Sequence, residues 1–336
     1  MRTSQKPLSA VIIGCGKMGG GAEESWSIEG TFSHAAAYNK HSKFEVIAGV
    51  DCQQRNRDNF SKSWQAPHVF CSLENCIESG LKFDVASVCV PTSQHADILN
   101  KLLETDVLAV MCEKPLTDDY TSSKGIADQY QQRGKLLSVN YPKIYFEGVG
   151  ALKKELDSKY WGEVKTIVGF YNKGIRNNGS HLVNLLQYLL GNIQINGVTK
   201  SREGFSPHDP TVDAFLQSES GVPIYLIGGD HKDFDLFEIQ LIAEKGVVAI
   251  EQSGNRIRRR RTMPHPNATG YKALKAGEWW DEKIETGILP VINNFWDAIS
   301  NDKALLTGGK QAAETDFICS NLAAASTAAG GKRLGE

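Results

Sequence analysis

The chain has 336 residues, which is enough for a large core and favours two packed lobes that share a cleft. Hydrophobic residues make up 41% of the chain and charged residues 23%, with a net charge of -2. This balance supplies no excess of positive charge that would attract nucleic acid or a membrane surface, so neither partner is expected.

Short β-branched runs alternate with helical patterns through the first 140 residues, which are expected to form one domain (1–140). The predicted strands are 8–14, 44–51, 85–91, 107–115 and 135–141. The predicted helices are 33–42, 95–106 and 118–134. Continuous apolarity is typical of parallel strands buried on both faces, and the alternation predicts an open α/β sheet with right-handed crossovers. Ligands should then bind at the carboxyl ends of its strands.

The pattern changes after residue 140, so 141–336 are expected to form a second domain. Its predicted strands are 162–171, 212–220, 221–230, 237–246 and 246–254. Its predicted helices are 147–158, one that opens near His181, 289–300 and 308–329. Strands that follow one another without helices predict an antiparallel sheet, and no low-complexity linker separates the two domains.

A glycine motif follows the first predicted strand directly. Gly14, Gly16 and Gly19 stand in the order G-x-G-x-x-G. Gly14 permits a tight turn, Gly16 lets the backbone approach a pyrophosphate, and the N–H groups of the next turn form an anion site. This context favours a dinucleotide-binding loop, with a plain turn of glycines as the alternative.

The second predicted strand ends in Asp51, whose carboxylate can accept hydrogen bonds from both hydroxyls of an adenosine ribose. A carboxylate at this position repels a 2′-phosphate. NAD is therefore favoured over NADP, although nearby Arg55 could soften the preference, and a surface cap is the alternative role for Asp51.

An insertion separates the glycine motif from Asp51. The two are 32 residues apart, counted from Gly19, whereas the usual interval is about 20. The surplus lies in 20–33, a glycine-rich polar stretch, and the helix is expected to restart near Ser33. Trp26 and His34 are candidate contacts with a cofactor, and a surface excursion without function is the alternative.

A charged pair, Glu113 and Lys114, ends a buried strand where a parallel sheet presents its ligand face. Pro115 restricts the backbone of Lys114 and so limits where its ammonium points. A lysine that is partly desolvated beside a cationic ring is expected to have a lowered pKa, which suits proton transfer. A solvated lysine at a strand end is the alternative.

Five motifs occur in a shared order with a known family: "GCGKMG", "VCVPTSQHADIL", "CEKPL", "VNYPKIY" and "GSHLVNLL". On the basis of these motifs the chain resembles, over nearly its whole length, the Gfo/Idh/MocA oxidoreductases, which include glucose-fructose oxidoreductase and inositol dehydrogenase. The resemblance implies a doubly wound N-terminal Rossmann domain and a C-terminal α+β domain. The open, mostly antiparallel sheet of the second domain would cover substrate on one face and form homodimer or homotetramer contacts on the other.

The resemblance also implies roles for particular residues. The cofactor would be bound by Gly14, Gly16, Lys17, Met18, Gly19, Asp51, Pro91, Thr92, His95, Glu113 and Lys114. Lys114 and His181 would hold the reacting hydroxyl, and Asn177 stands where relatives carry an aspartate four residues before the histidine. Asn177 brings no negative charge, so Lys114 is expected to be the principal acid/base and His181 a polarising or auxiliary group.

Substrate contacts are predicted for Asn140, Tyr141, Lys143 and Arg176, in addition to His181. Basic residues near the cleft suit a carboxylate or phosphate on the substrate, and solvated surface charge is the alternative.

Five arginines lie between 256 and 261 without interleaved aromatic residues. A strand edge guarded by charge or an oligomer contact is favoured over nucleic-acid binding, and the diphosphate of a nucleotide-linked sugar is a third reading.

Seven cysteines without C-x-x-C spacing and eight unclustered histidines predict buried reduced thiols and no metal. No segment reaches about 18 uninterrupted apolar residues, and the apolar N-terminal stretch is too short for a signal sequence, so a cytoplasmic location is expected.

These features predict an NAD(H)-dependent oxidoreductase that acts on a secondary hydroxyl or keto carbon of a sugar, cyclitol or nucleotide-sugar derivative. Two alternatives stay open. One is a non-catalytic dinucleotide-binding sensor, which Asn177 would favour. The other is a lyase or hydrolase that oxidises its substrate transiently with NAD.

Overall fold

The computed structural model describes residues 6–21, 29–206 and 208–329. The chain divides into two compact units. The first holds the residues up to Pro142 and Ile284–Glu314, and the second holds Lys143–Lys283 and the chain from Thr315 onward. The chain passes from the first unit to the second after Pro142, close to the predicted boundary at residue 140. Because residues 284–314 belong to the first unit again, the two units are not the continuous segments 1–140 and 141–336.

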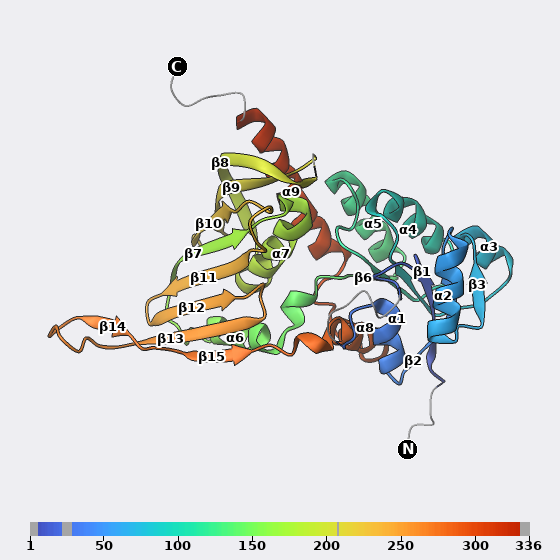
Figure 1. Cartoon of the computed structure of the whole chain (residues 1–336), viewed down its shortest axis with the longest axis horizontal. Coiled ribbons are helices and arrows are strands. Elements are labelled where there is room, and N and C mark those ends of the chain that lie inside the picture. The colour runs from blue at the N-terminus through green and yellow to red at the C-terminus, as the bar shows by residue number, and fades with distance from the viewer. Residues whose placement is uncertain (1–5, 22–28, 207, 330–336) are drawn as a thin grey trace. The chain divides into compact units, whose positions relative to one another are not determined.

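The described part of the first unit is built on a six-stranded parallel sheet in the order β3-β2-β1-β4-β5-β6 (Figure 1). Its strands are β1 (Leu8–Ile13), β2 (Phe44–Val50), β3 (His68–Phe70), β4 (Val85–Val88), β5 (Ala109–Cys112) and β6 (Leu136–Val139). Its helices are α1 (His34–Lys40), α2 (Gln54–Trp64), α3 (Leu73–Glu78), α4 (His95–Leu103), α5 (Tyr120–Gln132) and α8 (Leu289–Asn301). The strand order reverses between β1 and β4, which is the point where open α/β sheets bind ligands.

The predicted elements of this unit are confirmed, and α2, β3 and α3 are added between β2 and β4. The strands β4 and β5 are buried on both faces, as their continuous apolarity predicted, because every residue of both is buried, whereas the edge strand β3 has no buried residue. Side-chain caps mark where helices begin. The hydroxyl of Ser33 accepts a hydrogen bond from the Ala36 N–H at the start of α1, and Asp119 caps α5 in the same way.

The described part of the second unit contains a nine-stranded sheet in the order β14-β13-β12-β11-β7-β10-β9-β8, with β15 paired to β13. Its strands are β7 (Val164–Tyr171), β8 (Ile193–Ser206), β9 (Asp209–Ser218), β10 (Pro223–Gly228), β11 (Phe237–Ala243), β12 (Gly246–Glu251), β13 (Arg256–Pro264), β14 (Lys272–Leu274) and β15 (Glu278–Asp281). Among the described strands of this second sheet, only β7 and β10 pair in parallel, so the predicted mostly antiparallel sheet is confirmed. Figure 1 shows β11, β12 and β13 side by side, with β14 near the tip of an arm that extends beyond them.

Helices cover one face of this sheet. They are α6 (Glu147–Asp157), α7 (Gly179–Leu190) and the later part of α9 (Gly309–Ala329). Burial alternates along β11, where Ile239 and Leu241 join the same core as Leu182 and Leu186 of α7. The inward side chains, which alternate along β11, therefore pack against the apolar face of α7 in one core.

Candidate functional site

The glycine loop after β1 has the geometry that a close-approaching backbone needs. Gly14 has φ +92°, and a Cβ there would lie 2.6 Å from the carbonyl atoms of Cys89. A Cβ on Gly19 would lie 1.8 Å from the carbonyl oxygen of Gly14, so neither position tolerates a side chain. A Cβ on Gly16 would instead meet open space within 4 Å. Other protein atoms pack closely against Gly14 and Gly19, whereas the loop is open at Gly16, which fits the approach of a pyrophosphate.

Asp51 lies at the carboxyl end of β2, and its side chain is tied to this loop. Its Oδ2 accepts hydrogen bonds from the Cys15 N–H at 2.9 Å and from Asn56 Nδ2 at 3.1 Å. Its Oδ1 accepts the Gln53 N–H at 2.8 Å. The guanidinium of Arg57 donates to the Asp51 carbonyl oxygen at 2.6 Å, so this arginine is turned to the backbone. The glycine loop fits the pyrophosphate of an adenosine diphosphate, and the oriented Asp51 carboxylate fits its ribose.

The start of α1, which follows the insertion, lies against the glycine loop. The His34 N–H donates to the Met18 carbonyl oxygen at 2.8 Å, and the Ala35 N–H to that of Gly19 at 3.0 Å. The predicted restart of the helix near Ser33 is thereby confirmed. Trp26 lies outside the described residues. His34 is fully buried, so its side chain offers no exposed surface to a ligand.

Glu113 and Lys114 follow β5 directly, as expected. The Glu113 carboxylate accepts hydrogen bonds from Asn140 Nδ2 at 2.7 Å and from His34 Nε2 at 3.0 Å. It also accepts the Lys114 N–H at 3.3 Å. Burial opposes ionisation of Glu113, but the hydrogen bond and electrostatic interaction with His34 and the Asn140 contact outweigh it, so the pKa of this carboxyl lies below its usual value. Asn140, a predicted substrate contact, thus supports Glu113.

The loops after β4 and β5 are joined by His95, which is 1% exposed. Its Nε2 lies 2.9 Å from the Val90 carbonyl oxygen and its Nδ1 lies 3.0 Å from that of Pro115. Both ring nitrogens therefore face protein backbone. Pro91 and Thr92 lie in the same loop with exposed and half-buried surface, respectively.

In the second unit, a five-residue π-helical turn (Gly174–Asn178) leads into α7 and carries Arg176 and Asn177. The buried carboxylate of Asp209 accepts the Arg176 N–H at 2.7 Å and the Asn177 N–H at 2.9 Å. These N–H groups would otherwise lack partners at a helix start. Asp209 therefore holds the turn that presents Asn177, and no signal in the sequence pointed to it.

A cavity of about 250 Å³ opens beside this turn. It is lined by Lys143, Lys173, Asn177, Asn178, His181, Asp235, Leu236, Phe237 and Ser253. It brings together three of the predicted residues, Lys143, Asn177 and His181. Arg176 is absent from this lining and donates from Nη1 to Ser320 Oγ at 3.2 Å.

Lys143 is the most perturbed titratable group of this cavity. Its ammonium donates to the Ser253 carbonyl oxygen and lies 4.5 Å from the centre of the Phe237 ring. Burial lowers the pKa of Lys143 to about 8, and the more distant Asp235 opposes this shift. Asp235 itself pairs with Lys173. Lys173 could have been found as a lining residue from its position four residues before Asn177. Nothing in the sequence marked Asp235 or Phe237 as residues of this cavity.

The arginine run forms β13, and β13 has strand neighbours on both sides, so the predicted exposed edge is wrong. Every guanidinium of the run has a partner within the second unit. Arg256 pairs with Asp281 and Arg259 with Glu155, whereas Arg258, Arg260 and Arg261 donate to backbone carbonyl oxygens. Arg256 and Arg258 also lie over the Trp279 ring, at 4.3 and 5.1 Å from its centre.

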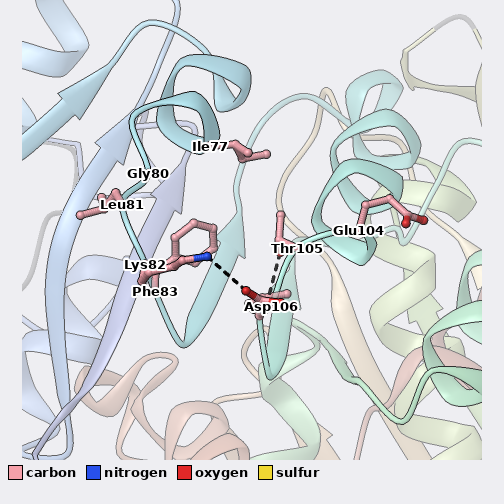
Figure 2. A pocket seen from close by; sticks show the side chains of 9 residues that line it. Ile77, Gly80, Leu81, Lys82, Phe83, Glu104, Thr105 and Asp106 are labelled. Carbon is pink, nitrogen blue, oxygen red and sulfur yellow. Dashed lines mark hydrogen bonds and ion pairs between the residues drawn. The ribbon is translucent and has the colours of Figure 1, made fainter.

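A smaller cavity of about 220 Å³ in the first unit lies at the amino ends of the strands β4 and β5 (Figure 2). Lys82 and Phe83 line it just before β4, and Thr105 and Asp106 line it before β5. An ion pair of 3.2 Å joins Lys82 to Asp106 across it. Ligands of such sheets bind at the opposite, carboxyl ends.

Within the described ranges, no group of three or more His, Cys, Asp or Glu side chains is placed to hold a metal ion. No helix in those ranges has the length and apolar character of a membrane span. All seven cysteines are free thiols, but Cys52 and Cys71 are exposed, so the prediction of uniformly buried thiols is wrong for these two.

Residues 8–141 match the model of an oxidoreductase family with an NAD-binding Rossmann fold. Two curated relatives are similar over part of their length. A protein named as the oxidoreductase subunit of a UDP-kanosamine synthase in Amycolatopsis mediterranei is 28% identical over 48% of this chain and 49% of its own. Inositol 2-dehydrogenase 1 of Paenarthrobacter aurescens is 27% identical over 65% of each chain. The matched segment thus spans about half to two thirds of these relatives.

Solved structures share the fold over nearly the whole chain. The WlbA dehydrogenase from Bordetella pertussis, in complex with NADH and UDP-GlcNAcA, has a TM-score of 0.79 at 16% identity and covers 97% of both chains. A 3-ketoreductase from Actinomadura kijaniata, in complex with TDP-benzene and NADP, has a TM-score of 0.74 at 15% identity, covering 95% of this chain and 98% of its own. At these identities the likeness shows the fold alone.

Proposed function

We propose that this chain, whose residues 8–141 belong to the Gfo/Idh/MocA oxidoreductase family, transfers hydride at a secondary hydroxyl or keto carbon of a sugar-type substrate. The observation that carries the proposal is the cavity that gathers Lys143, Asn177 and His181. The first unit adds a glycine loop that is open at Gly16 and a lysine at the end of β5.

NAD is the proposed cofactor, and when bound its nicotinamide ring supplies the hydride acceptor or donor. Gly14, Gly16, Lys17, Met18 and Gly19 would surround its pyrophosphate. Asp51 would accept the ribose hydroxyls, and this charge disfavours the 2′-phosphate of NADP. Pro91, Thr92, His95, Glu113 and Lys114 would complete its surroundings from the loops after β4 and β5.

Lys114 is the proposed principal acid/base, and His181 would polarise the same oxygen or assist the proton transfer. Asn177, on the turn before His181, would orient the imidazole or a substrate hydroxyl through its amide. Tyr141 and Asn140 stay proposed substrate contacts, although their burial in the first unit supports a structural role beside it.

The substrate class is proposed to be an acidic sugar or a nucleotide sugar. Lys143 supports this choice, because its ammonium is buried in the cavity and lies within 4.0 Å of no carboxylate among the described residues. A carboxylate or phosphate of the substrate would supply the missing counter-charge. One relative and two solved structures have names that refer to UDP- or TDP-linked molecules, and they support the nucleotide-sugar form of this proposal.

The direct test is a screen of neutral, acidic and nucleotide-linked sugars with NAD and NADP, followed by the absorbance of the reduced nicotinamide. We expect turnover with NAD and an anionic sugar. Replacement of Lys114 by Ala should lower kcat by about 10²-fold or more while NADH still binds. An unchanged kcat in this variant would overturn the assignment of Lys114.

A non-catalytic sensor is the second candidate, and Asn177, where the family resemblance implies an aspartate, is the residue that favours it. A sensor would bind NADH and a sugar but would turn over none of the panel. A lyase or hydrolase with transient oxidation would differ from both, because it would form product without net accumulation of NADH.

A further inference from the structure

His34 is the first residue of α1, and 0% of its surface is exposed. Both ring nitrogens face polar side chains. Nδ1 lies 2.9 Å from Ser87 Oγ and Nε2 lies 3.0 Å from Glu113 Oε1. Ser87 Oγ lies in turn 3.0 Å from the hydroxyl of Tyr38. A buried imidazole with both nitrogens engaged is held in one orientation.

The partners of His34 decide which ring nitrogen carries a proton. The lowered pKa of Glu113 keeps its carboxylate ionised near neutral pH, and an ionised carboxylate only accepts hydrogen bonds. Nε2 must therefore carry a proton and donate a hydrogen bond to Oε1. The hydroxyls of Ser87 and Tyr38 can donate or accept, so they complete the network for either state of Nδ1.

His34 connects the two parts of the first unit that the proposed reaction uses. Its backbone N–H donates to the Met18 carbonyl oxygen in the glycine loop at 2.8 Å. Its side chain reaches Glu113, whose other oxygen accepts the Lys114 N–H at 3.3 Å. One residue thus bridges the loop that would hold the pyrophosphate and the backbone that carries Lys114.

We infer that His34 is a positioning residue, which holds the Glu113 carboxylate in place and through it fixes the backbone from which Lys114 projects. The inference rests on the proposed function, because only that function makes the place of Lys114 matter for a rate. A proton relay does not fit, since Ser87 and Tyr38 are 0% exposed and, among the described residues, the network extends no further than the Tyr38 hydroxyl.

The test compares three variants of the full chain. His34→Leu removes the donor and places an apolar group beside a partly buried carboxylate. His34→Gln keeps an amide donor near the place of Nε2. Tyr38→Phe is the matched control, because it removes the far hydroxyl of the same network but leaves all donors to Glu113.

We expect kcat to fall by about 10²-fold in His34→Leu, because a small displacement of a catalytic group has effects of this size. His34→Gln should recover most of this loss, and Tyr38→Phe should stay close to the wild-type kcat. A cooperative thermal unfolding transition and an unchanged circular dichroism spectrum show that each of the three variants is folded. A folded His34→Leu variant with wild-type kcat would overturn the inference.

A second readout does not depend on turnover. In protein labelled with ¹³C at the lysine ε carbon, the Lys114 signal is assigned by its loss in Lys114→Ala. We expect this signal to move in His34→Leu and to stay in place in Tyr38→Phe. If no sugar is turned over but the signal moves, the proposed function fails and the positioning role stands. If the signal stays in His34→Leu, the positioning role fails whatever the activity.

Discussion

The Lys143 amine shows how burial can tune one residue of the candidate site. Its Nζ is held by a backbone carbonyl and an aromatic face, neither of which carries a full negative charge. Desolvation therefore dominates and lowers its pKa to about 8. An amine with this pKa changes charge within the range where enzymes are commonly assayed.

Substrate affinity should depend on this charge. Below pH 8 Lys143 is an ammonium and can attract an anionic sugar, and above it the attraction is lost. We therefore expect KM for an acidic sugar to rise as the pH increases from about 7 to 9.5, while KM for a neutral analogue stays level. Lys143→Arg should keep a low KM over this range, because arginine stays charged. Parallel pH dependences for the two sugars would contradict the role of Lys143.

Stability should depend on the same group, with a sign set by its two pKa values. The pKa of Lys143 is about 8 in the folded chain and near the ordinary lysine value of 10.5 when unfolded. Between these values the unfolded chain binds more protons, so the free energy of unfolding should rise with pH, by at most about 3 kcal/mol. Lys143→Met should remove this dependence and be the more stable protein at pH 7. The difference in thermal unfolding between the two proteins, measured from pH 7 to 10.5, checks this.

At the scale of elements, the turn before α7 depends on a residue from the sheet. The π-helical turn Gly174–Asn178 widens the helix start and presents Asn177 to the cavity. Asp209 at the start of β9 accepts two of its backbone N–H groups. The element that presents the site is thus held by a strand more than thirty residues away along the chain.

Replacement of Asp209 by Ala should leave these two N–H groups without partners inside the protein. We expect the free energy of unfolding to fall by about 2 kcal/mol, the usual cost of losing hydrogen bonds to a charged acceptor. The kcat/KM should fall as well, because Asn177 lies on the released turn and His181 on the first turn of the helix that follows it, whereas NADH affinity should be retained. Glu203→Gln is the control, since the exposed Glu203 side chain makes only a 3.8 Å ion pair with Lys232. Equal unfolding curves for the two variants would refute the role of Asp209.

At the scale of the whole molecule, the first unit is not a continuous segment. Residues 284–314 return to it and contribute α8. Phe295 and Trp296 of α8 lie against Phe44 of β2, with ring centres 6.3 and 5.6 Å apart from it. Phe295 is 0% exposed, so α8 completes the apolar core beside β2 and α1.

A fragment that ends at residue 142 should therefore expose apolar surface and bind NADH poorly. A second fragment, in which a flexible linker joins residue 142 to 284–314, restores α8 and should bind NADH close to the affinity of the full chain. Binding of a hydrophobic dye and NADH fluorescence measure the two effects. If both fragments bind NADH alike, α8 is dispensable for the first unit.

Much of the fold follows from local patterns. The alternation of buried strands and helices predicted the parallel sheet, and the excess spacing before Asp51 placed an insertion that ends at the Ser33 cap. These signals are readable because hydrophobic periodicity, glycine φ angles and helix caps act within a few residues. The order of the motifs also located Lys114 and His181 as candidate residues.

Tertiary structure decided the rest, because it depends on residues that are distant in the chain. The sequence could not show that Asp209 holds the Asn177 turn, that His34 faces Glu113, or that 284–314 returns to the first unit. Nor could it show that Lys143 is half-buried beside Phe237, or that desolvation of its ammonium lowers its pKa. Desolvation and hydrogen-bond partners are properties of the packed chain, so the residue types of the site were predictable and their chemistry was not.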